Sequence, residues 1–281
     1  MTSQLSKLEN FRSLFKNAPK PIIGMIHLPA LPGTFNNHLP LDDIISFALH
    51  DLSSLIDGGV NGVLVENYHD YPYNKNSMNK DSLISMSIIA REIISKSTIP
   101  VGINVLRNAC TEALLLSSLL GGKFIRCNFL TGAYVTDQGL IEGCANELKK
   151  LQKQLSFELK SSNQLIFADV HCKHASPLTN RDIVLDALDT FERGCADAII
   201  ITGERTGVEP NLSELKKLKT KNLHPIIIGS GINKENISKY LDYSDGVIIG
   251  TACKENNIIS NPVDKNMVKI LMEKVKQFKE T

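Results

Sequence analysis

The sequence predicts a single (β/α)₈ barrel, and three observations lead to this prediction. Apolar runs typical of buried strands recur at intervals of roughly 20 to 40 residues, with helical patterns between them. The 281 residues suit one such barrel, which needs about 250. No G-x-G-x-x-G turn follows the first strand, although a doubly wound sheet would normally show one.

Strand-like runs and helical patterns alternate along the whole chain. We expect strands at residues 21–27, 62–66, 100–105, 124–127, 165–170, 198–202, 225–230 and 246–250. We expect helices at residues 41–56, 81–96, 109–120, 146–159, 182–193, 212–219, 233–240 and 262–279. Residues 1–20 are predicted to form an N-terminal helical extension of one domain that covers residues 1–281.

Composition and charge exclude several classes of partner. The formal net charge is +1 and no block of Lys and Arg occurs, which argues against a nucleic-acid partner. No apolar run approaches the ~20 residues of a transmembrane helix, so membrane insertion is not expected. Residues 1–20 lack the apolar core of a secretory signal, which favours a cytoplasmic protein. Their serines and basic residues leave a transit peptide open as the alternative.

The six cysteines are scattered along the sequence, without a C-x-x-C pair. This spacing is typical neither of a zinc ribbon nor of a disulfide framework, so reduced and mostly buried thiols are expected. Cys127, Cys172 and Cys253 fall near predicted strand ends, where a nucleophile is the alternative interpretation.

Two glycine-containing strand ends near the C-terminus predict a phosphate site. The runs at 225–232 and 246–252 are β-branched and apolar, and each ends in glycine and a small hydroxyl residue. In a (β/α)₈ barrel, the loops after strands 7 and 8 commonly bind a substrate phosphate on backbone N–H groups. The residues expected to bind phosphate are Gly229, Ser230, Gly231, Gly250 and Thr251.

Charged residues at the carboxyl ends of strands 2 and 5 are the candidates for catalysis, because barrel enzymes place their chemistry there. Glu66 and Asp169 are expected to act as acid and base. Lys173 is expected to contact a phosphate or carboxylate, with a Schiff base as the alternative. Period-two spacing would turn Asp169, His171 and Lys173 to one face, with His174 adjacent. The two histidines are expected to be auxiliary proton carriers.

Other interpretations of these residues stay open. Asp169 and His171 would also suit a divalent metal ion, completed by Glu66 or His27. The structural alternatives are a buried ion pair of the carboxylates and hydrogen bonding of the histidines within a loop. Six further polar residues at strand ends are expected to contact substrate: His27, Asn67, Asn104, Arg126, Asn128 and Thr202.

Five segments resemble the BtpA/SgcQ family. These are residues 23–33, 62–67, 136–143, 168–175 and 249–252. The resemblance implies a barrel similar to the ribulose-phosphate-binding barrels; one branch of the family is named for photosystem I biogenesis, and another is associated with sugar metabolism. The chain departs from the family pattern at Cys172 and at residues 203–207, and the second departure concerns the rim of the substrate pocket.

Together these features predict an enzyme that acts on a phosphorylated sugar or related small metabolite by acid/base chemistry of the isomerase or lyase type. A divalent metal is an open possibility as cofactor, and a homo-oligomer is compatible with the sequence. The alternative is a non-catalytic assembly or stability factor of the photosystem I biogenesis type.

Overall fold

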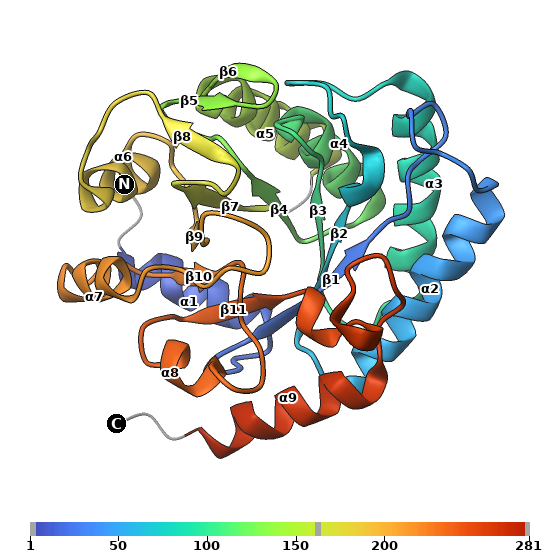
Figure 1. Ribbon diagram of the computed structural model, residues 1–281. Coiled ribbons are helices and arrows are strands. Elements are labelled where there is room, and N and C mark those ends of the chain that lie inside the picture. Colours follow the sequence, from blue (N-terminus) through green and yellow to red (C-terminus); the bar gives the residue numbers. More distant parts are fainter. Residues whose placement is uncertain (1–3, 161–163, 279–281) are drawn as a thin grey trace.

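A closed barrel of parallel strands forms the centre of the computed structural model, which describes residues 4–160 and 164–278. Going around the barrel, the strands follow the order β1, β2, β3, β4, β7, β9, β10 and β11 (Figure 1). Their bounds are Ile22–His27, Gly62–Glu66, Val101–Asn104, Phe124–Cys127, Leu165–Val170, Ala198–Ile201, Ile226–Ile228 and Gly246–Ile249. This order is that of consecutive βαβ units, and it confirms the predicted (β/α)₈ barrel.

Helices surround the barrel, and their apolar faces pack on the outer side of the strands (Figure 1). They are α2 Leu41–Gly58, α3 Lys80–Lys96, α4 Cys110–Leu120, α5 Ala145–Leu159, α6 Ile183–Glu192, α7 Leu212–Thr220, α8 Ile237–Leu241 and α9 Lys265–Gln277. Most lie within two residues of their predicted bounds, because the apolar spacing that buries each helix also reveals it in the sequence.

The last two helices are shorter than predicted, because polar side chains bind the backbone ahead of them. Asn233 and Asn236 each accept a backbone N–H of the other, which holds residues 233–236 in a turn before α8. Asp264 accepts the N–H of Asn266 at 2.7 Å and caps α9, so this helix begins at Lys265 rather than at residue 262. Residue 279, its predicted end, lies outside the described residues.

Helix α1, Gln4–Leu14, closes the end of the barrel at which the strands begin. The rings of Phe11 and of Phe15, which follows the helix, enter the barrel and pack against Phe167 and Phe124, with centroids 5.6 and 5.9 Å apart. Both rings are at least 98 % buried. The barrel interior is therefore filled at this end, and a ligand has access only from the opposite end.

A small antiparallel sheet, absent from the sequence prediction, lies at the carboxyl ends of the barrel strands. It pairs the hairpin of β5, Ala133–Thr136, and β6, Gly139–Glu142, with β8, Ala175–Pro177. Along the chain, the hairpin comes between β4 and α5, and β8 comes between β7 and α6 (Figure 1). These strands are largely exposed and lack the continuous apolar run that marks the equally short barrel strands, although Gly139, with φ 86°, marks the hairpin turn.

Strand register brings the polar strand ends to one level. His27 on β1 is opposite Glu66 on β2, and Glu66 is opposite Asn104 on β3. Arg126, one residue before the end of β4, is opposite Phe167 on β7. Because the strands are parallel, their carboxyl ends meet at one mouth, which holds the candidate site.

Candidate functional site

A buried charged centre occupies the mouth of the barrel. Arg126 donates two hydrogen bonds to the carboxylate of Asp169, at 3.2 and 3.0 Å, and its Nη1 lies 3.9 Å from the Oε2 of Glu66. All three side chains are at most 2 % exposed. Burial opposes the charge of Arg126, but the two carboxylates outweigh it and raise the pKa of the guanidinium.

Two asparagines hold the carboxylates in place. Asn104 donates to Glu66 and Asn128 donates to Asp169, each at 2.5 Å. Asp169 also accepts a hydrogen bond from the thiol of Cys172 at 3.4 Å, so its carboxylate has several hydrogen-bond donors around it. The side-chain oxygens of both asparagines are buried and have no hydrogen-bond partner among the described residues. Buried polar atoms without a partner are uncommon in folded proteins.

Lys173 carries an amine that forms no hydrogen bond or ion pair with another described residue. Its backbone is fixed, because its N–H donates to the hydroxyl of Thr202 at 3.0 Å and its carbonyl accepts from Arg107 at 2.5 Å. Burial, and then the charge of Arg126, lower the pKa of Lys173. The residue therefore presents a cation that gives up its proton more readily than a surface lysine.

His27 lies at the end of β1 and is 5 % exposed. Its Nδ1 has no partner among the described residues, and its ring makes an edge contact with Tyr68, with centroids 4.9 Å apart. Burial, together with the charges of Lys254 and Lys173, lowers the pKa of His27 well below its usual value. The imidazole is therefore neutral at physiological pH and aims a ring nitrogen into the mouth.

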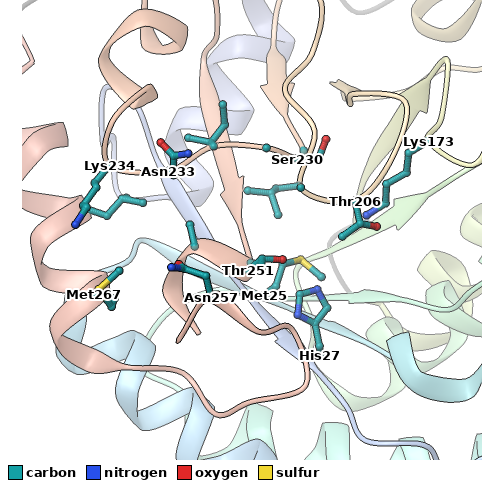
Figure 2. A pocket seen from close by; sticks show the side chains of 18 of the residues that line it. Met25, His27, Lys173, Thr206, Ser230, Asn233, Lys234, Thr251, Asn257 and Met267 are labelled. Atoms are coloured by element: carbon teal, nitrogen blue, oxygen red, sulfur yellow. The ribbon is translucent and has the colours of Figure 1, made fainter. Parts of the chain in front are cut away.

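The predicted phosphate residues line a cavity of about 310 Å³ together with these polar groups. Gly229, Ser230, Gly231, Gly250 and Thr251 all contribute to its wall, as do Glu66, Arg126, Lys173 and His27. Figure 2 shows Lys173 and His27 on one side of the cavity and Lys234 and Met267 on the other, with Thr251 between them. The predicted phosphate residues therefore share one cavity with Glu66 and Lys173, whereas Asp169, His171 and His174 do not line it.

Both glycine-containing loops contribute residues with free backbone N–H groups to the wall of this cavity. The N–H groups of Gly231 and Ile232, in the loop after β10, donate to none of the described residues, and neither do those of Thr251 and Ala252, after β11. Gly231 has φ 70°, a conformation that glycine adopts without strain. The hydroxyl of Ser230 is already engaged, since it accepts from Gly203 and donates to Val208.

A second cavity of about 1140 Å³ adjoins the first. It lies between the loops after β2, β3, β4, β7 and β9, and Arg107, Asn128 and Tyr73 line it. Glu66 and Lys173 belong to the walls of both cavities. The free amine and the buried carboxylate thus stand where the two cavities join.

The expected cluster of Asp169 and His171 does not form. Strand β7 ends at Val170, and His171 has φ 53°, so the alternation that would have put both side chains on one face stops between them. His171 instead contacts Asp186 on α6, with Nε2 2.9 Å from Oδ2. The two side chains therefore have different partners in this structure, Arg126 for Asp169 and Asp186 for His171.

Two other expected site residues are engaged in loop structure. His174 is exposed, and its Nε2 lies 3.2 Å from the hydroxyl of Thr206. Asn67 donates to Asp70 and accepts the N–H of Leu106, which ties the loops after β2 and β3 together. Asn67 lines neither of the two cavities.

Sequence reasoning missed Arg107 and Tyr68, and it placed Thr206 only within the pocket rim at residues 203–207. Arg107 stacks on Phe129, with its guanidinium carbon 5.0 Å from the ring centroid, and binds the backbone of Lys173. The hydroxyls of Tyr68 and Thr206 lie 3.5 Å apart across the mouth. These residues follow their strand ends by two to five positions, so a wider window after each strand would have included them.

Comparisons with known proteins agree with this architecture. An uncharacterized protein of Pyrococcus horikoshii is 41% identical over 93% of this chain and 98% of its own length. The photosystem I biogenesis protein BtpA of Synechocystis is 39% identical over 90% of this chain and 87% of its own length. In the described part of the chain, no helix is long and apolar enough to cross a membrane.

Solved structures of similar fold include N-(5'-phosphoribosyl)anthranilate isomerase from Pyrococcus furiosus, with a TM-score of 0.56. It is 16% identical, and the match covers 92% of this chain and 99% of that one. At this identity the likeness concerns the barrel alone. The model of the BtpA family matches residues 18–277, nearly the whole chain. The chain therefore belongs to the BtpA family.

Proposed function

We propose that this protein is an enzyme that binds a phosphorylated sugar or related metabolite at the barrel mouth and transfers a proton next to a carbonyl group. The observation that carries the proposal is the position of Glu66 and Lys173 at the junction of two cavities. One cavity offers backbone donors for a phosphate, and the other has room for the remainder of the substrate.

Glu66 fits the role of the base better than Asp169. Asp169 is held by two bonds from Arg126 and lines neither cavity, whereas Glu66 lines both and has Arg126 at 3.9 Å. Glu66 would take the proton from the carbon next to the carbonyl. Asp169 would act as a positioning residue by fixing Arg126.

Lys173 fits the role of the acid that faces the developing oxyanion. Its amine has no partner among the described residues, and its lowered pKa favours proton donation to a carbonyl oxygen. Arg126 adds a fixed positive charge beside it. Return of the proton to the adjacent carbon would make the reaction an isomerisation, whereas cleavage of a neighbouring C–C bond would make it a lyase reaction.

The phosphate would anchor the substrate at the other end of the smaller cavity. Backbone N–H groups from two loops suit a phosphate, because they donate to several oxygens at once. Lys234 lines the same cavity and would add a positive charge at its rim. Anchoring there would leave the carbonyl within reach of Glu66 and Lys173.

Solvent exchange tests this proposal on a panel of candidate substrates. Aldose and ketose phosphates are incubated with the protein in D₂O, and mass spectrometry follows deuterium incorporation next to the carbonyl. We expect exchange in at least one of them, and a loss of ~10²–10⁴-fold in its rate for Glu66→Gln. Asp189→Asn, at an exposed ion pair with Arg181, serves as the control and should exchange like the wild type.

The name of the Synechocystis relative favours a second candidate, a non-catalytic assembly factor. Complementation of a deletion strain separates the two. A folded Glu66→Gln variant that fully restores the phenotype, together with a wild-type protein that exchanges no sugar phosphate, would refute the enzyme and support the assembly factor. A folded variant that fails to complement supports catalysis.

A further inference from the structure

Three cysteines that are far apart in the sequence converge on the outer side of β4. Cys110 is the first residue of α4, Cys127 is the last residue of β4, and Cys144 directly precedes α5. The sulfur of Cys127 lies 2.9 Å from that of Cys110 and 3.5 Å from that of Cys144. All three sulfurs lie within 4.8 Å of one another.

This convergence is set by the fold and not by a local motif. Cys127 points outward from the barrel, between Arg126 and Asn128, whose side chains face the mouth. The other two thiols come from the starts of neighbouring helices that pack on the same strand. A sequence without C-x-x-C therefore still builds a three-thiol cluster, which its spacing alone did not predict.

Two helix starts favour negative charge at the cluster, whereas burial raises the pKa of the Cys110 and Cys127 thiols. Helices α4 and α5 both begin at the cluster, and the start of a helix carries a partial positive charge. Among the described residues, no His, Asp or Glu side chain joins the three sulfurs. The neighbouring oxygens are the amide of Asn108, 3.2 Å from the sulfur of Cys110, and the carbonyl of Phe129, 3.5 Å from that of Cys144.

We infer that Cys110, Cys127 and Cys144 form a binding site for one thiophilic metal ion, Cu⁺ or Zn²⁺. Soft thiolate ligands select these ions from the metals available to a protein. With metal–sulfur bonds of about 2.3 Å, three sulfurs around one ion are roughly 4 Å apart. The cluster reaches this spacing if the Cys110 and Cys127 sulfurs separate by about 1 Å. Zn²⁺ would take a water or the Asn108 oxygen as its fourth ligand.

The site has a route for the ion and a position apart from the mouth. Cys110 and Cys127 are buried, whereas Cys144 is partly exposed, so an ion would enter past Cys144. A bound ion would join α4, β4 and α5 behind Arg126 and Asn128. The ion would lie apart from the groups proposed to react with substrate. The inference of a metal site therefore does not depend on the proposed sugar chemistry.

Metal titration of the full chain tests the site. The protein is purified under anaerobic, reducing conditions and titrated separately with Cu⁺ and Zn²⁺ against a coloured chelator, while native mass spectrometry counts the bound ions. We expect one ion per chain for at least one metal. Cys110→Ser, Cys127→Ser and Cys144→Ser should each weaken its binding by roughly tenfold or more, since even outer partners of a metal site are worth about that much.

Two cysteines outside the cluster provide matched controls. Cys195 is exposed and Cys253 is buried, and serine at either position should leave metal binding unchanged. Melting curves without metal show which variants fold, and Cys144→Ser is decisive because its partly exposed side chain tolerates the change best. The inference would be overturned if a folded Cys144→Ser variant bound both ions with the same affinity as the wild type. It would also be overturned if the control variants lost as much metal affinity as the cluster variants.

Discussion

At the scale of single residues, the barrel mouth contains two kinds of charged residue. Some fix the geometry of the site, and others are held less tightly and could contact a substrate. Asp169 and Glu66 look alike in the sequence, since each is a carboxylate at a strand end. The structure distinguishes them by their partners, because Arg126 binds Asp169 with two hydrogen bonds and lies farther from Glu66. Residue type and spacing thus predict where charged side chains cluster. Only the contacts in the structure show which of them is bound by an ion-pair partner.

We predict that Asp169→Asn destabilises the protein by ~3–5 kcal/mol, because it leaves the buried charge of Arg126 with a weakened partner. Urea unfolding monitored by circular dichroism measures the change. Asp189→Asn, which breaks an exposed pair with Arg181, should cost less than ~1 kcal/mol. If both variants unfold alike, Asp169 is not the structural partner that its contacts indicate.

The lowered pKa of Lys173 predicts a pH-dependent reactivity. Its uncharged amine is populated at a lower pH than that of an ordinary lysine, because burial and the charge of Arg126 disfavour the ammonium form. Reductive methylation with formaldehyde, followed by peptide mapping, measures labelling of Lys173 relative to surface lysines. We expect this ratio to be greatest near neutral pH and to fall as the pH rises and the surface amines lose their protons. A ratio independent of pH would contradict the lowered pKa.

At the scale of elements, the barrel strands and most helices could be predicted because each buries a regular apolar face. The small sheet of β5, β6 and β8 could not, since its strands are largely exposed and lack a continuous apolar run. The expected pairing of Asp169 with His171 failed for a related reason. Strand alternation was extended one residue beyond β7, into a residue with φ 53°. Local periodicity is thus informative inside an element and loses its meaning at the element's end.

Helix α1 is predicted to contribute to stability by closing the barrel. Phe11 is fully buried against Phe15 and Phe167, so Phe11→Ala should cost ~3–5 kcal/mol in the free energy of unfolding. Phe157 is 85% exposed, and Phe157→Ala should change stability by less than ~0.5 kcal/mol. Denaturant unfolding of both variants measures these changes. A small loss for Phe11→Ala would mean that the barrel end is stable without this ring.

At the scale of the whole molecule, parallel topology accounts for most of what the sequence could reveal about the site. Gly231 and Thr251 lie twenty residues apart, yet they line one cavity because β10 and β11 are neighbours in the barrel. The same topology brings Glu66 and Lys173 to the junction of both cavities. The convergence of Cys110, Cys127 and Cys144 depends equally on topology, but it lies outside the strand-end rule and was therefore missed.

The central claim is that this mouth binds a phosphorylated metabolite with its phosphate between the loops after β10 and β11. A crystal structure with the sugar phosphate that shows the fastest exchange in D₂O tests it most directly. We predict phosphate oxygens within hydrogen-bond distance of the N–H groups of Gly231, Ile232, Thr251 and Ala252, and a carbonyl carbon beside Glu66 and Lys173. A sugar phosphate bound elsewhere on the protein, with this cavity closed to it, would contradict the claim.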